Sequence, residues 1–364
     1  MRRKVFITVS SLDYGGVEVR TLESIAKMIE MNVDIDFLVC AVSGKEGQLD
    51  EKYRELGVDV VYAKGSMWIQ RVINLYVVLK KQKPDVFHAN ASYASGIFAF
   101  VAFLAGIRRR VSHIRSLGFP EMASWRKCKY NFYLPMLNFF SNVVVGVASE
   151  AQKKAKTPDN KWQTLYDGIP FSDYVGNLKS KDKNQPLKLV VVGRFHECKN
   201  LTFPVDVANR LMQKSGRPVE LIYIGQETPE IKLSIDKKAA RCGMSNSVFY
   251  MGRLARNKTL KLISESDILL VTSIREGLPG TIIEAASCGV PSLGSSLPGV
   301  VEISSFISSV VALPLASGSQ AWADKALDLV EAWDGQGIEI ETMFRQSPFT
   351  VDRHVGKLLA LWFD

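Results

Sequence analysis

The sequence predicts an α/β protein made of two successive doubly wound domains, each a parallel sheet with helices on both faces. Three observations lead to this prediction. The chain has 364 residues, more than the size at which a single hydrophobic core usually keeps growing. Short apolar runs alternate with amphipathic stretches, which is typical of strands joined by helices. A polar segment interrupts this alternation once, near the middle, and the alternation then restarts.

The first half begins with a buried strand and continues as strand and helix in turn. Short apolar runs indicate strands, and apolar residues three or four positions apart indicate helices. We expect strands over 5–9, 36–42, 58–62, 86–88, 110–113 and 143–147. We expect helices over 17–30, 47–56, 69–83, 94–106 and 127–141.

The second half repeats the pattern after the polar residues 172–185. We expect strands over 187–192, 219–224, 248–251, 268–272 and 291–293. We expect helices over 201–215, 231–242, 258–265, 279–288 and 350–363. The predicted division is a first domain over 1–170, a linker over 171–186, a second domain over 187–345 and a C-terminal segment over 346–364 whose helix can cross back to the first domain. Ligands of such sheets bind beyond the carboxyl ends of the strands, so we expect the ligand between the domains.

Composition and charge narrow the class of protein. Hydrophobic residues make up 47% and charged residues 23% of the chain, as in globular proteins. Five scattered cysteines without a Cys-x-x-Cys pair indicate neither a disulfide framework nor a zinc site, and fit a reducing cytoplasm. The first apolar run is too short for a signal peptide, and the longest, 97–107, is shorter than the roughly 20 residues that span a bilayer. The net charge of +9 lies mostly before residue 171, which suggests an anionic partner there.

A glycine-punctuated turn between a strand and a helix, within residues 273–291, carries the most chemistry. Gly277 and Gly280 allow a ligand to approach the backbone closely, and Pro279 suits the first turn of a helix. The amides of Gly280, Thr281 and Ile282 would then point outward at a helix N-terminus, where a diphosphate can bind.

Two glutamates lie in the same segment. Glu276 is in the turn, where a carboxylate can face a cleft. Glu284 lies near the top of the following helix and can accept both hydroxyls of a ribose. Each glutamate taken alone could equally be a solvated carboxylate of a capping loop.

A second group follows the strand 187–192. Gly193 ends the strand, and Arg194 and Lys199 follow in the next loop. Two cations beside a strand end can neutralise the charge that develops on a departing nucleoside diphosphate. Surface ion pairing is the alternative. His196 lies between them, and we interpret it as a loop residue.

Glycines and histidines mark the corresponding strand ends of the first half. Gly15 and Gly16 link the first strand to its helix, which suits either a ligand loop or a tight turn. His88 and His113 end two strands where a cleft is expected, and we favour His113 as the site residue. Each histidine could instead have a purely structural role.

The segment 273–291 closely resembles the paired-glutamate motif of glycosyltransferase family 4, whose members are retaining enzymes of the GT-B fold, with two Rossmann-like domains facing across a cleft. The matching pattern is Glu276-Gly277-x-Pro279, Glu284-Ala285 and Cys288-Gly289-Val290-Pro291. The resemblance covers most of residues 1–310, strongly in the second domain and diffusely in the first. It implies a bacterial polysaccharide-type glycosyltransferase.

The resemblance also implies roles for individual residues. Glu276 would contact the donor sugar and stabilise the reacting centre, and Glu284 would hold the nucleotide ribose. Arg194 and Lys199 would hold the leaving diphosphate, a task that often replaces a metal in this family. The remaining donor-site positions and the residue nearest the sugar or acceptor would be Gly15, Gly16, Gly193, Gly225, Leu254, Gly277, Gly280, Thr281 and His113.

Two segments depart from the family pattern. The family has His-Ser-Arg or His-Ser-His where this chain has His113-Ile-Arg115-Ser, and Asn where it has Asp167. The resemblance supplies no general base for the acceptor hydroxyl, and that role stays open.

Basic and aromatic residues interleave over 108–133. Such a segment can lie on an anionic membrane surface or bind single-stranded nucleic acid, or it can pack its aromatic rings inward. With a sugar-transfer site in the same chain, a lipid-linked acceptor at the cytoplasmic leaflet explains it better than nucleic acid.

The sequence therefore predicts a retaining hexosyltransferase that uses a nucleotide-sugar donor, with no metal and no other cofactor. We expect a glycan or lipid-linked acceptor, a role in cell-envelope polysaccharide synthesis, no nucleic-acid partner, and a cytoplasmic location, peripheral at the membrane. The alternatives are a sugar-nucleotide 2-epimerase of the same fold and a non-catalytic two-lobed sugar-binding protein. A dinucleotide oxidoreductase is disfavoured because residues 9–16 lack the Gly-x-Gly-x-x-Gly turn.

Overall fold

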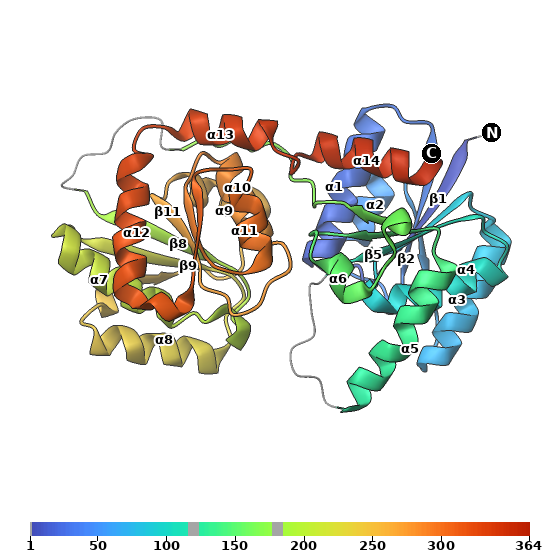
Figure 1. The fold of residues 1–364 in the computed structure, drawn as a ribbon, viewed down its shortest axis with the longest axis horizontal. Helices are drawn as coiled ribbons and strands as arrows, with labels where there is room; N and C mark the ends of the chain where they lie inside the picture. Colours follow the sequence, from blue (N-terminus) through green and yellow to red (C-terminus); the bar gives the residue numbers. More distant parts are fainter. Residues whose placement is uncertain (1, 116–123, 177–184) are drawn as a thin grey trace. The chain divides into compact units, whose positions relative to one another are not determined.

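The computed structural model describes residues 2–115, 124–176 and 185–364, with only the backbone over 124–130. The described chain divides into two compact units, one made of residues 1–170 with 351–364 and the other of residues 171–350. Each unit is a parallel sheet with helices on both faces (Figure 1). This confirms the predicted fold class.

The first unit contains a seven-stranded parallel sheet in the order β3-β2-β1-β4-β5-β6-β7. Its strands are β1 (Arg3–Val9), β2 (Ile35–Ala41), β3 (Asp59–Tyr62), β4 (Val86–Ala89), β5 (Arg109–Ile114), β6 (Val143–Gly146) and β7 (Trp162–Thr164). Its helices are α1 (Gly16–Glu30), α2 (Asp50–Glu55), α3 (Trp68–Gln82), α4 (Ser95–Leu104), α5 (Ser124–Phe140), α6 (Ala151–Ala155) and α14 (Val351–Phe363). The strand order reverses between β1 and β4.

Alternating side chains of β1 fill two separate cores. Val5 and Ile7 pack with α1, α2 and α14 on one face of the sheet. Phe6 packs with α3 and α4 on the other face. Because both faces of the strand are buried, the sequence of β1 is apolar throughout rather than alternating.

The C-terminal helix α14 belongs to the first unit. Leu358 and Trp362 are buried in the core that β1 and α1 share. The guanidinium of Arg109, on β5, donates to the carbonyl oxygen of Leu361 at 2.6 and 2.9 Å. The helix thus completes one face of the first sheet, although some 180 residues separate it from the rest of the unit.

The second unit contains a six-stranded parallel sheet in the order β10-β9-β8-β11-β12-β13. Its strands are β8 (Leu187–Val192), β9 (Val219–Ile224), β10 (Val248–Tyr250), β11 (Ile268–Val271), β12 (Ser292–Ser295) and β13 (Val310–Leu313). Its helices are α7 (Phe203–Ser215), α8 (Pro229–Arg241), α9 (Arg256–Ser264), α10 (Gly280–Ser287), α11 (Pro298–Ser304), α12 (Gly318–Ala332) and α13 (Gly337–Gln346). Here the order reverses between β8 and β11.

The described part of the polar segment between the two halves packs with the second unit. The thiol of Cys288 donates to the hydroxyl of Ser172 at 3.3 Å, and the amide of Gly176 donates to the carbonyl oxygen of Cys288 at 2.8 Å. Residues 171–176 are therefore anchored rather than a free linker. The rest of the expected linker, 177–184, lies outside the described residues.

Most predicted elements agree with the structure within a few residues, and 187–192 and 219–224 agree at both ends. The helix expected over 47–56 begins only at Asp50, because the carboxylate of Asp50 accepts from the amide of Gly47 and the amide of Leu49 donates to Leu12. The sequence analysis missed β7, β13, α6, α11, α12 and α13. The two missed strands are three and four residues long and end their sheets, so their apolar signal is weak.

Candidate active site

In the second unit, two loops leave adjacent strands where the strand order reverses. The loop after β8 contains Gly193, Arg194 and Lys199, and the loop after β11 contains Glu276 and Gly277. Ligands of doubly wound sheets bind at such a reversal because the loops diverge there and leave a crevice. The two groups of residues singled out in the sequence are thus adjacent in the fold.

An ion pair joins these loops. The ammonium of Lys199 pairs with Oε1 of Glu276, and the hydroxyl of Ser273 donates to the same oxygen at 2.9 Å. The hydroxyl of Thr272 donates to the carbonyl oxygens of Lys199 and Asn200 at 3.1 and 3.2 Å. The side chains of Lys199 and Glu276 remain 25% and 17% exposed, so the pair is held in place yet accessible.

Arg194 lies at the same strand end but projects outward. It is exposed, and its guanidinium has no hydrogen bond or ion pair among the residues that the structure describes. His196, in the same loop, accepts from the amide of Cys198 at 3.2 Å through Nδ1, as expected of a loop residue.

Two glycines allow the strand ends to come close together. Gly193 and Gly225 have φ angles of +154° and +153°, which L-residues with side chains rarely adopt. A Cβ on Gly225 would lie 2.0 Å from the carbonyl oxygen of Gly193. A Cβ on Gly193 would lie 3.4 Å from Cε of Lys199. Both positions therefore require glycine for the backbone, whatever further role they have.

The N-terminus of α10 presents free backbone donors. Among the described residues, the amides of Gly280 and Thr281 have no acceptor. The amide of Ile282 donates to the carbonyl oxygen of Pro279 at 3.1 Å, so it is not available as the sequence analysis expected. Pro279 is the residue before the helix rather than in its first turn. Two amides and the positive end of the helix dipole remain to bind an anion.

Glu284 lies in the second turn of α10 and is nearly buried. Its carboxylate pairs with Nε of Arg256, at the start of α9, at 3.5 Å. Arg256 gave no signal in the sequence analysis because a single arginine in a polar stretch is indistinguishable from a surface residue. The ribose contact expected of Glu284 stays a prediction.

Leu254 and Gly277 border the same end of the sheet. Leu254 is half-buried between β10 and α9, and the amide of Gly225 donates to Gly252, just before it, at 2.8 Å. The carbonyl oxygen of Gly277 packs against Gly299, where a Cβ would lie 2.0 Å from it. The start of α11 thus fixes the loop that carries Glu276.

In the first unit, a carboxyl group already covers the N-terminus of α1. A Cβ on Gly15 would lie 2.3 Å from Oε2 of Glu18, so this carboxylate folds back over Gly15. Burial raises the pKa of Glu18, and backbone hydrogen bonds from Glu18 and Ser11 oppose that shift. An ionised Glu18 would repel a phosphate at this helix end. Donor binding by Gly15 and Gly16 stays a prediction that this arrangement disfavours.

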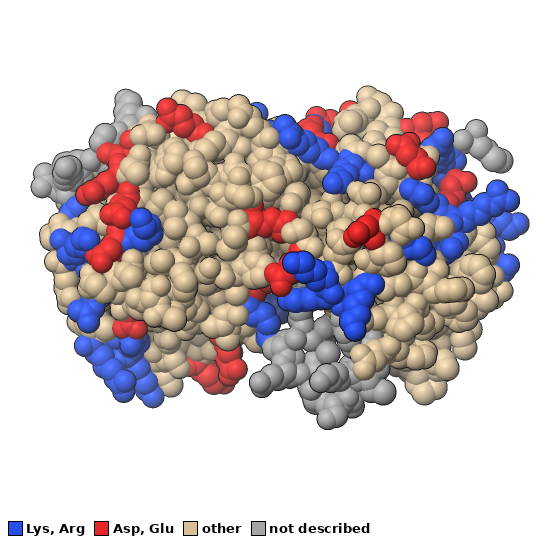
Figure 2. All heavy atoms as spheres, viewed as in Figure 1, with Lys and Arg blue, Asp and Glu red and all other residues tan. Residues whose placement is uncertain are grey.

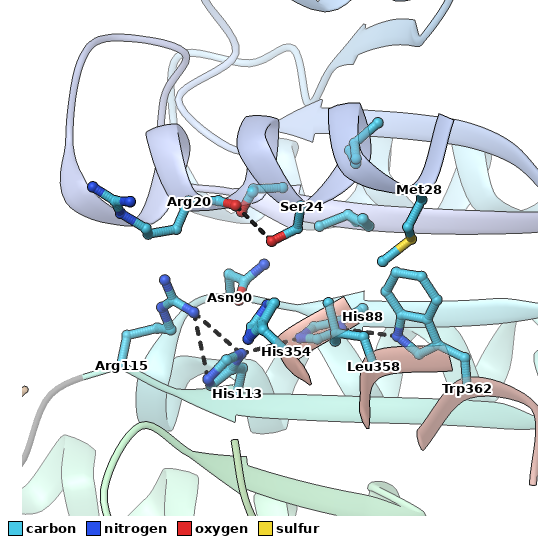
Figure 3. A pocket seen from close by; sticks show the side chains of 13 residues that line it. Arg20, Ser24, Met28, His88, Asn90, His113, Arg115, His354, Leu358 and Trp362 are labelled. Carbon is cyan, nitrogen blue, oxygen red and sulfur yellow. Dashed lines mark hydrogen bonds between the residues drawn. The ribbon is translucent and has the colours of Figure 1, made fainter. Parts of the chain in front are cut away.

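His113 lies in a buried chain of hydrogen bonds (Figure 3). The indole of Trp362 donates to Nδ1 of His88 at 3.0 Å, and Nε2 of His88 lies 3.3 Å from Nδ1 of His113. Because an indole can only donate, the proton of neutral His88 must lie on Nε2, which then donates to His113. His88 and His113 are 3% and 1% exposed. A contact of His113 with sugar or acceptor stays a prediction.

A third histidine completes this cluster. Nδ1 of His354, on α14, lies 2.6 Å from the carbonyl oxygen of Tyr166. Burial is the first cause that lowers the pKa of all three rings, to about 3 for His88 and about 4 for His354. The positive charge of Arg115 contributes to each shift. The three histidines are therefore neutral at physiological pH.

The two segments that depart from the family pattern contact each other through Arg115 and Asp167. Nη2 of Arg115 lies 2.9 Å from Oδ1 of Asp167, and both side chains are mostly buried. The same guanidinium lies 3.5 Å from both ring nitrogens of His113. Asp167 thus offsets the charge that Arg115 brings next to the histidines. Sequence reasoning noted both residues but could not connect positions 52 residues apart.

Much of the described basic segment 108–133 has structural contacts. Arg109 binds the end of α14, and Arg110 donates to the carbonyl oxygens of Phe140 and Ile107 at 2.6 Å. Residues 116–123 lie outside the described residues. Nowhere in 2–115, 124–176 or 185–364 is there a helix whose length and apolarity would let it cross a bilayer.

The chain is similar to known glycosyltransferases in both sequence and fold. Residues 186–332 match the family described as Glycosyl transferases group 1. The capsular polysaccharide biosynthesis glycosyltransferase CapH of Staphylococcus aureus is 28% identical over 78% of each chain. The putative glycosyltransferase EpsF of Bacillus subtilis is 22% identical over 99% of this chain and 96% of its own.

Solved structures share the fold over nearly the whole chain. Anabaena Alr3699/HepE, solved in complex with UDP, superposes with a TM-score of 0.77 at 17% identity and covers 98% of both chains. Staphylococcus aureus TarM superposes with a TM-score of 0.75 at 11% identity over all of this chain and all of its own. At these identities the likeness concerns the fold, and the family match concerns the second unit. The chain is therefore a glycosyltransferase of the GT-B fold, and residues 186–332 of its second unit are similar to the group 1 glycosyltransferases.

Proposed function

We propose that the chain transfers a hexosyl unit, with retention at the anomeric carbon, from a nucleoside-diphosphate sugar to a glycan or lipid-linked acceptor. The setting is cell-envelope polysaccharide synthesis at the cytoplasmic face of the membrane. One observation carries the proposal: Lys199, Glu276 and the free amides of α10 all lie on the two loops where the second sheet reverses its strand order. The polysaccharide glycosyltransferases among its relatives support the setting.

The proposed chemistry follows from the charges at this site. The bond between the anomeric carbon and the diphosphate breaks, and its electron pair goes to the diphosphate. Lys199, Arg194 and the amides of Gly280 and Thr281 offset the added negative charge, which lowers the barrier. The acceptor oxygen attacks on the same face, and its proton goes to a diphosphate oxygen. Glu276 stabilises the positive charge that develops on the sugar ring.

A panel of nucleotide sugars identifies the donor. The donor should raise the melting temperature, since a ligand at about 100 times its Kd stabilises the folded state by about 2.7 kcal/mol. UDP-sugars come first, because Anabaena Alr3699/HepE was solved with UDP-glucose. The shift should persist in EDTA if no metal holds the diphosphate. A chain that no nucleotide sugar stabilises would contradict the proposal.

A product assay then separates transfer from epimerisation. Incubation of the donor without acceptor should leave the nucleotide sugar unchanged, whereas a 2-epimerase would convert it. Transfer to a glycan or lipid-linked acceptor should yield free nucleoside diphosphate and a lengthened acceptor in equal amounts.

The α10 amides can be tested at Gly280. A Cβ added there meets no atom within 4 Å, so Gly280→Ala should fold normally. The methyl group would, however, crowd a diphosphate bound at the helix N-terminus, and we expect donor affinity to fall about tenfold. Gly356→Ala is the matched control, since that Cβ also meets nothing within 4 Å but lies on α14. Calorimetric titration with the donor measures both, and equal affinities would argue against phosphate binding at Gly280.

A further inference from the structure

Helices α3, α4 and α5 expose a continuous apolar surface on the first unit, here called the α3–α5 face. Ile73 and Tyr76 of α3, Leu104 of α4 and Phe132 of α5 line a groove in it. Ile73, Leu104 and Phe132 are 58%, 50% and 60% exposed. A large exposed apolar patch of this kind is typical of a surface that binds a protein, a membrane or a ligand.

The groove continues toward the C-terminal ends of these helices. Phe140 contacts Phe100 of the groove with ring centroids 4.8 Å apart, and it also contacts Phe103 and Phe139 at 5.4 and 4.9 Å. Phe139 is 77% exposed and Phe103 49%. Each of the three helices is followed by a strand of the parallel sheet. The C-terminal ends of the helices therefore all lie at the end of the sheet where the strands begin.

Positive charge borders the same edge. Lys80 and Lys81 end α3, Arg108 follows α4, and all three side chains are exposed. Nζ of Lys80 lies 5.9 Å from the ring centroid of Tyr76, and the guanidinium of Arg110 lies 5.4 Å from that of Phe103. Basic groups held against aromatic rings suit the boundary between lipid tails and headgroups.

Negative charge is absent from these helices. The sequences of α3, α4 and α5 contain no Asp or Glu. In Figure 2 the region where Figure 1 places α3 and α4 is largely uncharged. Acidic side chains are visible elsewhere in the same view. An apolar face bordered by Lys80, Lys81 and Arg108 complements an anionic surface that also accepts apolar groups.

We propose that the α3–α5 face docks the enzyme on an anionic lipid bilayer. A second copy of the chain fits less well, because a two-fold contact would bring the same positive border against itself. The inference deepens the proposed function, since an acceptor anchored in lipid requires the enzyme at the bilayer. It also extends the membrane contact beyond the segment 108–133, which contributes Arg108 and Phe132, to the exposed sides of α3 and α4.

Vesicle sedimentation tests the docking. The full chain should sediment with vesicles of equal parts phosphatidylglycerol and phosphatidylcholine, and should not sediment with phosphatidylcholine alone. Ile73→Glu combined with Leu104→Glu should weaken binding about tenfold or more, because it places negative charge in the apolar contact. Lys80→Glu combined with Lys81→Glu should weaken it to a similar extent.

The controls separate docking from folding and from catalysis. Leu233→Glu combined with Ile338→Glu replaces residues that are 53% and 65% exposed on the second unit, and it should sediment as wild type does. Lys199→Ala should also sediment normally, so loss of transfer and loss of docking are distinguishable. Melting temperatures measured without donor verify that each variant is folded.

Three results would overturn the proposal: no sedimentation of wild type, sedimentation that Ile73→Glu with Leu104→Glu leaves unchanged, or equal binding to neutral vesicles. A wild-type dimer that the same double variant converts to monomer, with vesicle binding unchanged, would assign the face to self-association instead.

Discussion

Lys199→Ala is expected to lower kcat by about 10³-fold while leaving the fold intact. The ammonium of Lys199 is held against Glu276 at the strand reversal, where the leaving diphosphate gains negative charge in the proposed reaction. Removing one preorganised donor from such a site costs about 10²–10³ in kcat, and removing a full charge lies at the upper end. The ion pair is partly exposed and contributes at most about 1 kcal/mol to stability, so the melting temperature should change by no more than about 4 °C.

A matched variant shows whether the effect depends on the position of the lysine or only on the loss of a positive charge. Lys214→Ala also removes a lysine from an ion pair in the second unit, because Lys214 pairs with Asp324 at 2.6 Å on the surface. It should retain full activity. Initial rates and melting curves for both variants, measured side by side, provide the comparison. Wild-type kcat in Lys199→Ala would refute the assignment of Lys199 to the diphosphate.

Glu276→Gln examines the other half of the pair. Glutamine can still accept from Ser273, so the loop after β11 should keep its position. The charge that balances the developing positive sugar is lost, and we expect kcat to fall about as far as in Lys199→Ala while donor affinity changes less. A large rise in the Kd of the donor without a fall in kcat would instead indicate that Glu276 only binds the donor.

Lowering the pH from 7 to 4.5 is expected to destabilise the first unit by several kcal/mol through its three buried histidines. In the folded chain the pKa values of His88 and His354 are lowered to about 3 and about 4, and that of His113 is lowered as well. In the unfolded chain each histidine titrates near 6.5. Below that value the unfolded state binds more protons, so stability present above pH 6.5 is lost as the pH falls toward the folded pKa values. His88 and His354 each contribute about 2 kcal/mol over this range, and His113 acts in the same direction.

The first physical cause is burial, which disfavours a charged ring, and an added proton would also meet a positive or donating group. A proton on Nδ1 of His88 would face the indole N–H of Trp362, and one on Nδ1 of His113 would face the N–H of His88. Arg115 and Arg20 add repulsion at His354, which Asp167 opposes. The protonated histidines can reach water only when α14 separates from the sheet, since His354 and Trp362 both lie on that helix.

Urea unfolding at each pH measures the free energy of unfolding. Hydrogen exchange of individual peptides shows which part of the chain loses stability. Peptides from β4 and β5 should lose protection between pH 6.5 and 4.5 more steeply than peptides from β8 and β11. His354→Asn retains a donor for the carbonyl oxygen of Tyr166 but does not titrate, so it should flatten the pH dependence. His196→Asn, in an exposed loop, should leave the pH dependence unchanged. Identical slopes in wild type and His354→Asn would show that the cluster does not set the acid sensitivity.

The sequence by itself determined the fold class and the position of most strands. Both faces of each parallel sheet are buried, so strands such as 187–192 and 219–224 are unbroken apolar runs that need no tertiary information. It also singled out two loops of the second unit that the fold places after adjacent strands, because Gly193, Lys199, Glu276 and Gly280 occur within two short segments. Of the three amides expected to be free at the start of α10, that of Ile282 donates to Pro279 instead, because this hydrogen bond depends on how the turn closes.

Tertiary structure alone decided which distant residues meet. Nothing in the sequence near His88 indicates that Trp362 will donate to it, or that His354 will lie in the same cluster, because these contacts arise only when α14 packs on the first sheet. Likewise Asp167 and Arg115 belong to two separate segments that depart from a family pattern, and only the fold places them 2.9 Å apart. Periodicity reports how a residue relates to its chain neighbours, whereas hydrogen bonds and ion pairs depend on positions in space that the packing of whole elements sets.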